Sequence, residues 1–400
     1  MYTNPAQMEP LFPKTEGDLS DLALKVFSES AKLSEMIHPL TRDKIVALLR
    51  HINSYYSNRI EGEHTTPADI ERAVRQEFSS NEKNKRLQLL SLAHIQVQKK
   101  IDKRLDKEDL EVVSTEFIRW IHKEFYENVP EEFRIIKNPT NDEELRLIPG
   151  ELRQREVYVG DHLAPSAESL HDFMRRFEDV YRIKNLYGHK KLVAAVASHH
   201  RLAWIHPFLD GNGRVGRLFT YAFMRKTSLD SVGLWTLSRG LARSASEYKR
   251  MLALADGTRQ GNYDGRGNLT EKGLVKFCEY IFNTALDQIK FMKSLLNLDE
   301  LYNRISGYVQ LRSQNMLPGE NPLRIEAKYI LTEVMMRGQV KRGEVARITG
   351  LGDRTARELT SQLLDEELLA SSNHKKPLQF NIPPKVVGYY FPSLYPEGTI

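Results

Sequence analysis

The stretch HPFLDGNGRVGR, from His206 to Arg217, gathers side chains that suit a ligand with several phosphates. Arg214 and Arg217 are three positions apart and would share one helix face, where their guanidinium groups match phosphate oxygens. Asp210 offers a hard oxygen ligand for a Mg²⁺ ion that bridges phosphates. The glycines would let a phosphate come close to the backbone. Because His206 could accept the proton of an incoming hydroxyl, these residues predict a polyphosphate site with a metal ion and a general base.

Two helices would hold this stretch in place. The apolar spacing predicts a helix over residues 189–205, which Pro207 ends, and a second helix over residues 213–226. The first turn of a helix has backbone N–H groups without intrahelical partners, and these groups bind anions. The loop between the two helices would therefore present a phosphate with both backbone donors and arginine side chains.

The same stretch resembles, at every position, the motif of the Fic family, His-Pro-Phe-x-(Asp/Glu)-Gly-Asn-Gly-Arg-x-x-Arg. The resemblance implies an adenylyltransferase that moves AMP from ATP to a Ser, Thr or Tyr hydroxyl of a protein, itself included. It implies that His206 is the base and that Asp210 holds Mg²⁺, with Mn²⁺ also possible. It implies that Asn212 and the loop amides hold the inner phosphates and that the arginines hold the outer ones. The expected nucleotide contacts are Asp210, Gly211, Asn212, Gly213, Arg214, Val215, Gly216 and Arg217.

Two further stretches resemble parts of the same family. Residues 149–165, PGELRQREVYVGDHLAP, alternate and turn at Gly160, which predicts a β-hairpin. They resemble the family's flap, which would cover the nucleotide or pair with an extended target segment. The expected flap contacts with the nucleotide are Val159, Gly160, Asp161 and His162. Residues 244–257 resemble the helix that packs on the nucleoside, with Asp256 contacting the base and Tyr248 lining the adenine pocket or belonging to the core.

Glu61 lies in the last turn of a predicted helix over residues 41–62, which Thr41 would cap. The helix dipole disfavours an anion there, so Glu61 needs a cation or remains solvated. Residues 57–62, SNRIEG, resemble the family's inhibitory motif, (Ser/Thr)-x-x-x-Glu-(Gly/Asn). The resemblance implies that Ser57 and Glu61 are inhibitory, and that Glu61 pairs with Arg217 in place of the γ-phosphate.

The remaining periodicity predicts a mainly α protein: a helical Fic core with a short β-hairpin flap, and a small C-terminal winged helix-turn-helix domain. The expected division is an N-terminal helical region at 1–110, a core at 111–297, a linker at 298–322 and a winged-helix-like domain at 323–400. Other helices are predicted over 69–78, 85–105, 114–128, 166–183, 244–255, 270–297, 325–336, 341–349 and 353–367.

The C-terminal order of helix, helix, turn, helix, strand, basic tip and strand is typical of a winged helix. Arg354 and Arg357 would lie on its recognition helix, and Lys375 and Lys376 at its tip. The basic surplus is modest for DNA binding. Contact with DNA and a docking or homodimer surface therefore both stay open, with docking slightly favoured.

Composition sets broad limits. The chain has 400 residues, is 40% hydrophobic and 28% charged, and carries a net charge of +5, which allows an anionic partner without requiring one. One cysteine, Cys278, allows no internal disulfide and fits a reducing compartment. The start lacks the pattern of a signal peptide. The sequence has no run of 18 apolar residues, so neither a membrane span nor a membrane partner is expected. These observations predict a cytoplasmic protein.

Three alternatives to AMP transfer remain at this level. The first is a DNA-binding regulator whose core senses a nucleotide. The second is the reverse enzyme, which would remove AMP from a protein with Glu61 as base. The third is a metal hydrolase that uses His199, His200, His206 and Asp210, although this would leave the glycines and arginines of the motif without a role.

Overall fold

Helices dominate the computed structural model, which describes residues 2–14, 17–137, 143–160, 162–230 and 232–396. The N-terminal helices are α1 (Asp18–Ser34), α2 (Pro39–Ile60), α3 (Pro67–Val74) and α4 (Glu82–Lys107). The central helices are α5 (Thr115–Glu127), α6 (Leu170–Tyr181), α7 (Lys190–Ile205), α8 (Asn212–Lys226), α9 (Leu237–Arg243), α10 (Ala245–Asp256) and α11 (Glu271–Leu295). Two antiparallel hairpins join them: β1 (Ile135–Lys137) with β2 (Glu144–Arg146), and β3 (Tyr158–Val159) with β4 (His162–Leu163). Within the described ranges, no helix is long and apolar enough to span a membrane.

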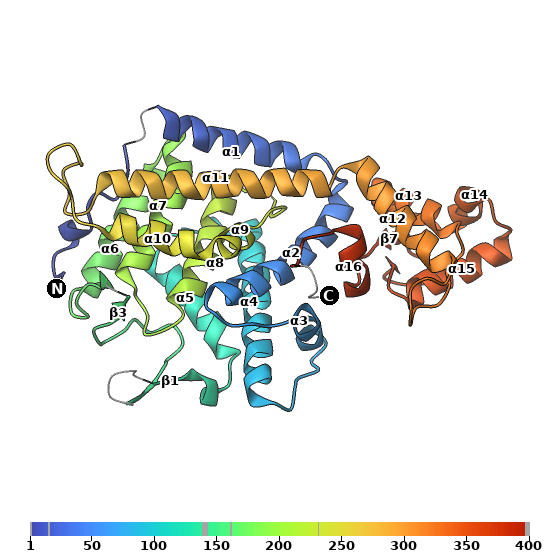
Figure 1. Cartoon of the computed structure of the whole chain (residues 1–400), viewed down its shortest axis with the longest axis horizontal. Helices are drawn as coiled ribbons and strands as arrows, with labels where there is room; N and C mark the ends of the chain where they lie inside the picture. Colours follow the sequence, from blue (N-terminus) through green and yellow to red (C-terminus); the bar gives the residue numbers. More distant parts are fainter. Residues whose placement is uncertain (1, 15–16, 138–142, 161, 231, 397–400) are drawn as a thin grey trace.

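Helix α7 lies at the centre of the fold. Its apolar residues Val193–Ala197 are fully buried, as expected for a helix that is covered on all sides. It packs on α6, α8 and α11, and α11 runs beside α1 along one edge of the molecule (Figure 1). The buried α7 ends directly before the loop that begins at His206, and α8 follows that loop.

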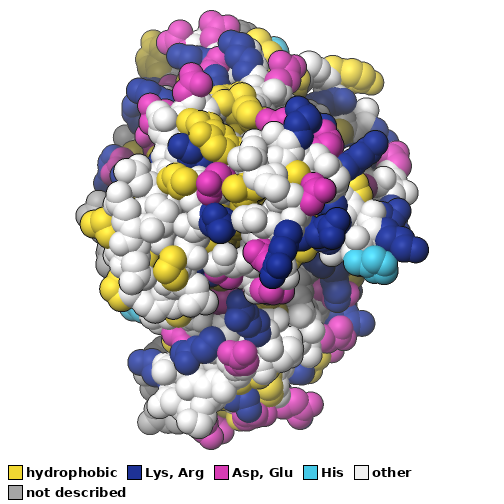
Figure 2. All heavy atoms as spheres, turned by 90° about the vertical axis from the view of Figure 1, so that its right-hand side faces the viewer, with side chains coloured by type: hydrophobic (Ala, Val, Ile, Leu, Met, Phe, Trp, Pro, Cys, Tyr) yellow, Lys and Arg dark blue, Asp and Glu magenta, His cyan; other side chains and the backbone are white. Residues whose placement is uncertain are grey.

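The C-terminal region follows α11 without a break in the packing. Its elements are α12 (Leu298–Ser313), α13 (Ala327–Arg337), β5 (Gln339–Val340), α14 (Val345–Thr349), α15 (Asp353–Asp365), β6 (Leu369–Ala370), β7 (Leu378–Phe380) and α16 (Pro384–Tyr390). The three strands form an antiparallel sheet in the order β5-β7-β6. The region occupies one end of the molecule (Figure 1). Seen from that end, Lys and Arg side chains mix with Asp and Glu side chains on the surface (Figure 2). The assignment of this region as a winged helix stays a prediction.

Most predicted helices are confirmed, with their ends shifted by a few residues. Ser114 caps α5 and Thr270 caps α11, each through a side-chain oxygen. The prediction that Thr41 caps its helix is wrong, because α2 begins at Pro39 and His38 is the cap. Thr41 instead lies inside α2, where its hydroxyl donates to the Met335 carbonyl at 2.7 Å.

The prediction of a linker over 298–322 is wrong for residues 298–313, which form α12. This helix buries apolar side chains against α13 and α16 and is capped by Asn297. The residues that favoured a linker, Pro318, Gly319 and Pro322, lie after this helix, in the turns between Ser313 and Ala327. Helices α1 and α9 and the β1–β2 hairpin were not predicted.

Candidate active site

A hydrogen-bonded loop joins α7 to α8. His206 ends α7 in the left-handed conformation, with φ 51° and ψ 62°. The side chain of Asn212 closes the loop, because its Oδ1 accepts from the Phe208 N–H at 2.9 Å and its Nδ2 donates to the Phe208 carbonyl at 2.8 Å. Gly211 has φ 81°, and a Cβ there would collide with the hydroxyl of Tyr126. The loop therefore needs both this asparagine and this glycine to keep its shape.

Arg153, a buried residue that the sequence did not single out for this role, fixes the entrance of the loop. Its Nε donates to the His206 carbonyl at 2.8 Å, and its backbone N–H donates to the Pro207 carbonyl at 2.9 Å. The His206 ring lies with Nδ1 3.4 Å from the Ala203 carbonyl, which places the proton on Nδ1 and leaves Nε2 as acceptor. Burial lowers the pKa of His206 to about 4. The ring is thus neutral near pH 7 and can accept a proton.

Asp210 is held by two neighbours and remains half-buried. Its Oδ1 accepts from the Gly211 N–H at 2.6 Å, and the hydroxyl of Tyr126 donates to its Oδ2 at 3.4 Å. Its carbonyl accepts from Nε2 of His122 at 3.3 Å, while Nδ1 of His122 accepts from the Gly150 N–H at 2.8 Å. Burial lowers the pKa of His122 to about 3, which agrees with this neutral tautomer. The loop backbone is thereby tied to α5.

Asp210 also fits a shared metal ion. Within the described residues, no three His, Cys, Asp or Glu side chains gather as a ligand set. Mg²⁺ is commonly bound by one or two carboxylates together with substrate phosphates and waters. A single half-buried carboxylate beside the start of α8 fits that arrangement, whereas it would not fit an ion held by protein ligands alone.

The end of α2 lies against α8. Arg217 donates from Nη2 to Oε1 of Glu61 at 2.6 Å, from Nε to the Ser57 hydroxyl at 2.9 Å and from Nη2 to the Ser57 carbonyl at 3.0 Å. The Arg217 side chain is 3% exposed and that of Glu61 is 33% exposed. Burial by itself raises the pKa of Glu61, but the guanidinium groups of Arg217 and Arg214 outweigh it and hold the pKa below its usual value. Glu61 is therefore an ion-paired carboxylate and not a solvated helix end.

The carboxylate of Glu61 also covers the first turn of α8. A Cβ built on Gly213 would collide with Oε1 of Glu61, so the glycine gives the carboxylate room. The N–H groups of this turn attract anions. The carboxylate thus lies where a phosphate bound to the same turn would lie.

Arg214 is held by a residue that was not predicted. Its Nη2 donates to Glu63 at 2.6 Å, and its Nε donates to Oδ1 of Asn58 at 3.3 Å. Glu63 also accepts from Arg86 at 2.9 Å. Both arginines of the loop are consequently paired with the end of α2. The sequence feature that could have indicated this pairing is Glu63 itself, a second glutamate two positions after Glu61.

Residues 112–224 match the model of the Fic/DOC family. The chain contains a Fic domain. Curated relatives named "Protein adenylyltransferase Fic" include those of Drosophila willistoni, 34% identical over 107 residues (27% of this chain, 20% of the relative), and Nematostella vectensis, 36% identical over 83 residues (21% and 19%). The chain thus spans about a fifth of the length of these relatives. A variant of Fic-1 from C. elegans has a similar fold, with a TM-score of 0.50 and 16% identity over 68% of this chain and 71% of that one.

The flap of the Fic domain has the predicted form. Tyr158 pairs with Leu163 and Val159 with His162, and Gly160 turns with φ 60°. Tyr158 and Val159 are exposed, whereas Nε2 of His162 donates to the Trp204 carbonyl at 2.8 Å. Asp161, also expected to contact the nucleotide, lies outside the described residues. Nucleotide contacts by the flap remain predictions.

Three residues expected at the nucleotide have side chains that contact other parts of the protein. Val215 is 1% exposed, so its side chain belongs to the core, and contact of its backbone N–H with the nucleotide stays a prediction. Tyr248 is 5% exposed and belongs to the core, where its hydroxyl lies 2.7 Å from Nε2 of His199. Asn212 has both side-chain polar groups bonded to Phe208, so it shapes the loop, and its contact with phosphates stays a prediction. The partners of Tyr248 lie on another helix, whereas Asn212 is held by Phe208 in its own loop.

The metal-hydrolase alternative finds no support in the described part of the Fic domain. Nδ1 of His199 lies 2.6 Å from the Thr220 hydroxyl, and its Nε2 is taken by Tyr248. His200 is fully buried and donates from Nε2 to Asp256 at 3.1 Å. Contact of Asp256 with the adenine base of the nucleotide stays a prediction. Because these rings point into the core, they do not converge with His206 on one ion.

Proposed function

We propose that the chain transfers AMP from ATP to a Ser, Thr or Tyr hydroxyl of a protein, including its own. The observation that carries this proposal is the α7–α8 loop. It brings a neutral His206 base, the Asp210 carboxylate, the first turn of α8 and two buried arginines together in twelve consecutive residues. The relatives named as protein adenylyltransferases support the same reaction.

Binding of ATP follows from the groups at the start of α8. The N–H groups of its first turn receive the inner phosphates, and Arg214 and Arg217 receive the outer ones. Asp210 would hold a Mg²⁺ ion, and the ion would neutralise part of the phosphate charge. Arg153 and Asn212 keep the loop in the shape that this binding needs.

The transfer step uses His206 as base. The target hydroxyl gives its proton to Nε2 of His206 while its oxygen forms a bond to the α-phosphorus. The bond between the α-phosphorus and the oxygen of the diphosphate breaks, and diphosphate leaves. His206 then releases the proton to water. The products are an AMP ester of the target residue, diphosphate and a proton.

Glu61 would hold this reaction in a low-activity state. It occupies Arg217 and the first turn of α8, which are the groups that the outer phosphates need. Two anions compete for one cation, so ATP bound beside Glu61 would lack a ligand for its γ-phosphate. Ser57 adds to this restraint because it accepts two hydrogen bonds from the same guanidinium group.

One experiment tests the reaction directly. The protein is incubated with Mg²⁺ and ATP that carries the label on either the α- or the γ-phosphate, and mass spectrometry then locates the modified residue. AMP transfer predicts incorporation from the α-position and none from the γ-position. Incorporation from the γ-position alone would show phosphorylation and reject the proposal. Loss of AMP from a purified modified protein, dependent on Glu61, would instead support the reverse reaction.

A separate proposal concerns DNA at residues 323–400. Arg354, Arg357, Lys375 and Lys376 are exposed there, which favours an anionic partner. Asp353 and Glu358 stand beside them and weaken the attraction. A gel-shift titration with duplex DNA at two salt concentrations tests this, and an affinity that does not fall with salt would reject it.

A further inference from the structure

A cavity separate from the Fic loop lies where the C-terminal region meets α2. Its volume is about 410 Å³, within the range of roughly 300–1,000 Å³ that small-molecule sites occupy. Its walls come from α2, the start of α3 and residues 381–387, with Tyr395 closing one side. Such junctions between two regions are common places for ligand sites.

One wall of this cavity is a single face of α2. Lys44, Ala47, Leu48 and His51 are spaced so that they share that face. The opposite wall is apolar and includes Ile382, Pro383, Pro384, Val387 and Tyr395. The cavity therefore combines an apolar interior with a lysine and a histidine on one side.

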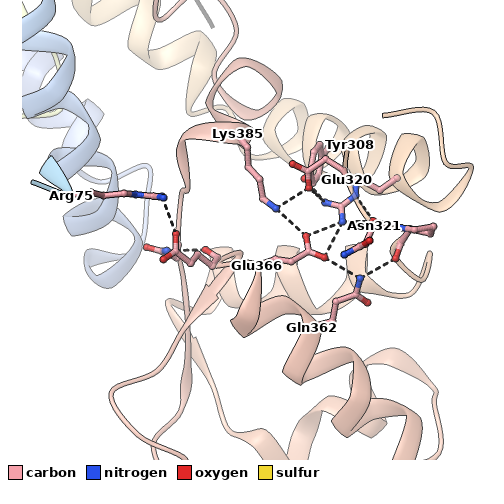
Figure 3. Close-up of polar contacts among 11 residues, drawn as sticks. Arg75, Tyr308, Glu320, Asn321, Gln362, Glu366 and Lys385 are labelled. Atoms are coloured by element: carbon pink, nitrogen blue, oxygen red, sulfur yellow. Dashed lines mark hydrogen bonds and ion pairs between the residues drawn. The ribbon is translucent and has the colours of Figure 1, made fainter. Parts of the chain in front are cut away.

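Most charges around this cavity are already paired. Lys385 donates to Glu320 at 2.9 Å and to Glu366 at 3.1 Å (Figure 3). Arg75 lies 3.3 Å from Glu71 and 3.7 Å from Glu367, so it shares its charge between two acidic residues of the lining.

Lys44 and His51 differ from these groups. Among the described residues, neither side chain has a hydrogen bond or an ion pair in the structure. Burial, with the nearby charge of Arg50, lowers the pKa of His51 to about 4, so its ring is neutral. Lys44 is thus a cation without a counterion at the edge of an apolar cavity, and a neutral imidazole lies two turns away on the same face.

We propose that this cavity binds a small amphipathic anion, namely an aromatic or branched apolar group that carries one acidic group. The acidic group pairs with Lys44, and His51 is within the same cavity to donate a hydrogen bond. The apolar group packs against Leu48 and Val387. Burial of such a group provides most of the affinity, and the charged pair fixes its orientation.

The cavity exists only while the C-terminal region is docked on α2. Two contacts near Ser57 maintain that docking: Tyr56 donates from its hydroxyl to the Leu394 carbonyl at 3.1 Å, and the Tyr55 and Tyr395 rings meet edge to face at 5.2 Å. A ligand that needs both walls stabilises the docked arrangement over any arrangement that lacks one of them. Because α2 is a continuous helix, His51 and Glu61 are rigidly linked at a separation of about 15 Å.

The ligand should therefore strengthen the hold of Glu61 on Arg217 and lower AMP transfer. This consequence rests on the proposed function, whereas binding itself does not. The cavity would act as an effector site, because binding of the anion there would stabilise the pairing of Glu61 with Arg217.

Anilinonaphthalene sulfonate, a fluorescent aromatic anion, is a direct probe of this cavity. Titration into the 400-residue chain should give a saturable signal with one site per chain. Ala47→Phe, which fills the cavity, and Lys44→Ala, which removes the cation, should each weaken binding at least about tenfold. The matched controls Ala253→Phe and Lys99→Ala alter exposed residues on other helices and should leave the affinity unchanged. Equal affinity in the parent and in both cavity variants would overturn the proposal.

A second measurement separates this site from the proposed reaction. With saturating probe, labelling from α-labelled ATP should fall in the parent and stay constant in Glu61→Gly. Localised binding with unchanged labelling of the parent would overturn the coupling to Glu61. If Glu61→Gly incorporates no label from the α-position, the proposal of AMP transfer is rejected. The fluorescence titration still tests whether the cavity binds the probe.

Discussion

Arg217 is the residue on which two competing uses of the loop converge. It is nearly fully buried, and its guanidinium group donates hydrogen bonds to Ser57 and Glu61. A buried guanidinium needs a partner, so Arg217 has to bind either the carboxylate or a phosphate. The state of this single side chain would therefore decide whether ATP is bound productively.

Replacement of Glu61 by glycine should raise AMP transfer. Loss of one partner of a buried ion pair shifts a balance by as much as roughly 3–5 kcal/mol, and the partial exposure of Glu61 places the effect below that limit. We expect at least about a tenfold rise in labelling from α-labelled ATP. Glu108→Gly is the matched control, because Glu108 is also the C-cap of a helix but lies on the surface. Equal or lower labelling in Glu61→Gly, with the fold intact, would reject the inhibitory role.

Replacement of His206 by alanine should abolish transfer and leave ATP binding in place. The ring contacts the Ala203 carbonyl weakly and holds no other element, so its removal should not unfold the loop. Loss of a general base costs on the order of 10²–10⁴ in rate. The initial rate of labelling in the Glu61→Gly background measures this, and calorimetry checks ATP binding. Labelling at the parent rate would contradict the assignment.

Replacement of Asp210 by alanine should remove the dependence of ATP binding on Mg²⁺. This carboxylate lies in the loop beside the first turn of α8 and fits an ion shared with phosphates. Binding of ATP is measured by calorimetry with Mg²⁺ and with chelator, for the parent and for Asp210→Ala. We expect a clear Mg²⁺ effect in the parent only. The same effect in both proteins would assign the ion to another ligand.

At the scale of elements, α2 is the connection between the two halves of the chain. Its last turn holds the arginines of α8, and it contacts the C-terminal region through Thr41 in its first turn and Tyr56 near its end. The C-terminal region also reaches the central helices, because Arg239 donates to the Ser393 carbonyl at 2.8 Å. The predicted linker over 298–322 therefore does not separate the two regions, because these contacts cross it.

Weakening the docking of residues 393–395 should raise the proposed AMP transfer through α2. Tyr56→Phe removes one hydrogen bond, worth about 1 kcal/mol, and Tyr395→Ala removes an edge-to-face ring contact of similar size. We expect labelling to rise several-fold in the double variant, with faster hydrogen exchange over residues 55–61. Tyr263→Ala, a change at an exposed tyrosine, is the control. A full additional rise in the Glu61→Gly background would show that the two changes act independently, against this prediction.

At the scale of the whole molecule, several histidines are buried as neutral rings. Burial lowers the pKa of His94, His122 and His199 to about 3 in each case. An unfolded chain would bind protons at these rings near pH 6.5. The folded protein must therefore become less stable as the pH falls, because the unfolded state takes up more protons.

Between pH 6 and pH 4, each of these histidines should lower the free energy of unfolding by about 1.4 kcal/mol per pH unit. The loss begins below the unfolded pKa and ends as the pH falls through the folded pKa. Urea denaturation at several pH values measures the slope. His94→Leu should reduce it by the share of one residue, because Nδ1 of His94 has no hydrogen-bond partner among the described residues. An unchanged slope in His94→Leu, or a changed one after replacement of the exposed His64, would contradict this account.

The sequence by itself determined the parts of this protein that depend on residue type and short spacing. The twelve residues from His206 specify a loop between two helices, and the alternation around Gly160 specifies a hairpin. Glu61 could be placed at a helix end because apolar periodicity and Gly62 mark that end. These features could be predicted since each follows from contacts within a few residues along the chain.

Only the tertiary structure decided which side chains surround the loop. The pairing of Glu63 with Arg214, the hold of Arg153 on His206 and the collision of Tyr126 with any Cβ at Gly211 join residues more than 50 positions apart. The docking of residues 393–395 on α2 spans an even longer separation. Such contacts depend on how complete helices pack, so local periodicity carries no signal for them. The same packing buries the side chains of Val215 and Tyr248, and for Tyr248 it selects the core, which the sequence had left open beside the adenine pocket.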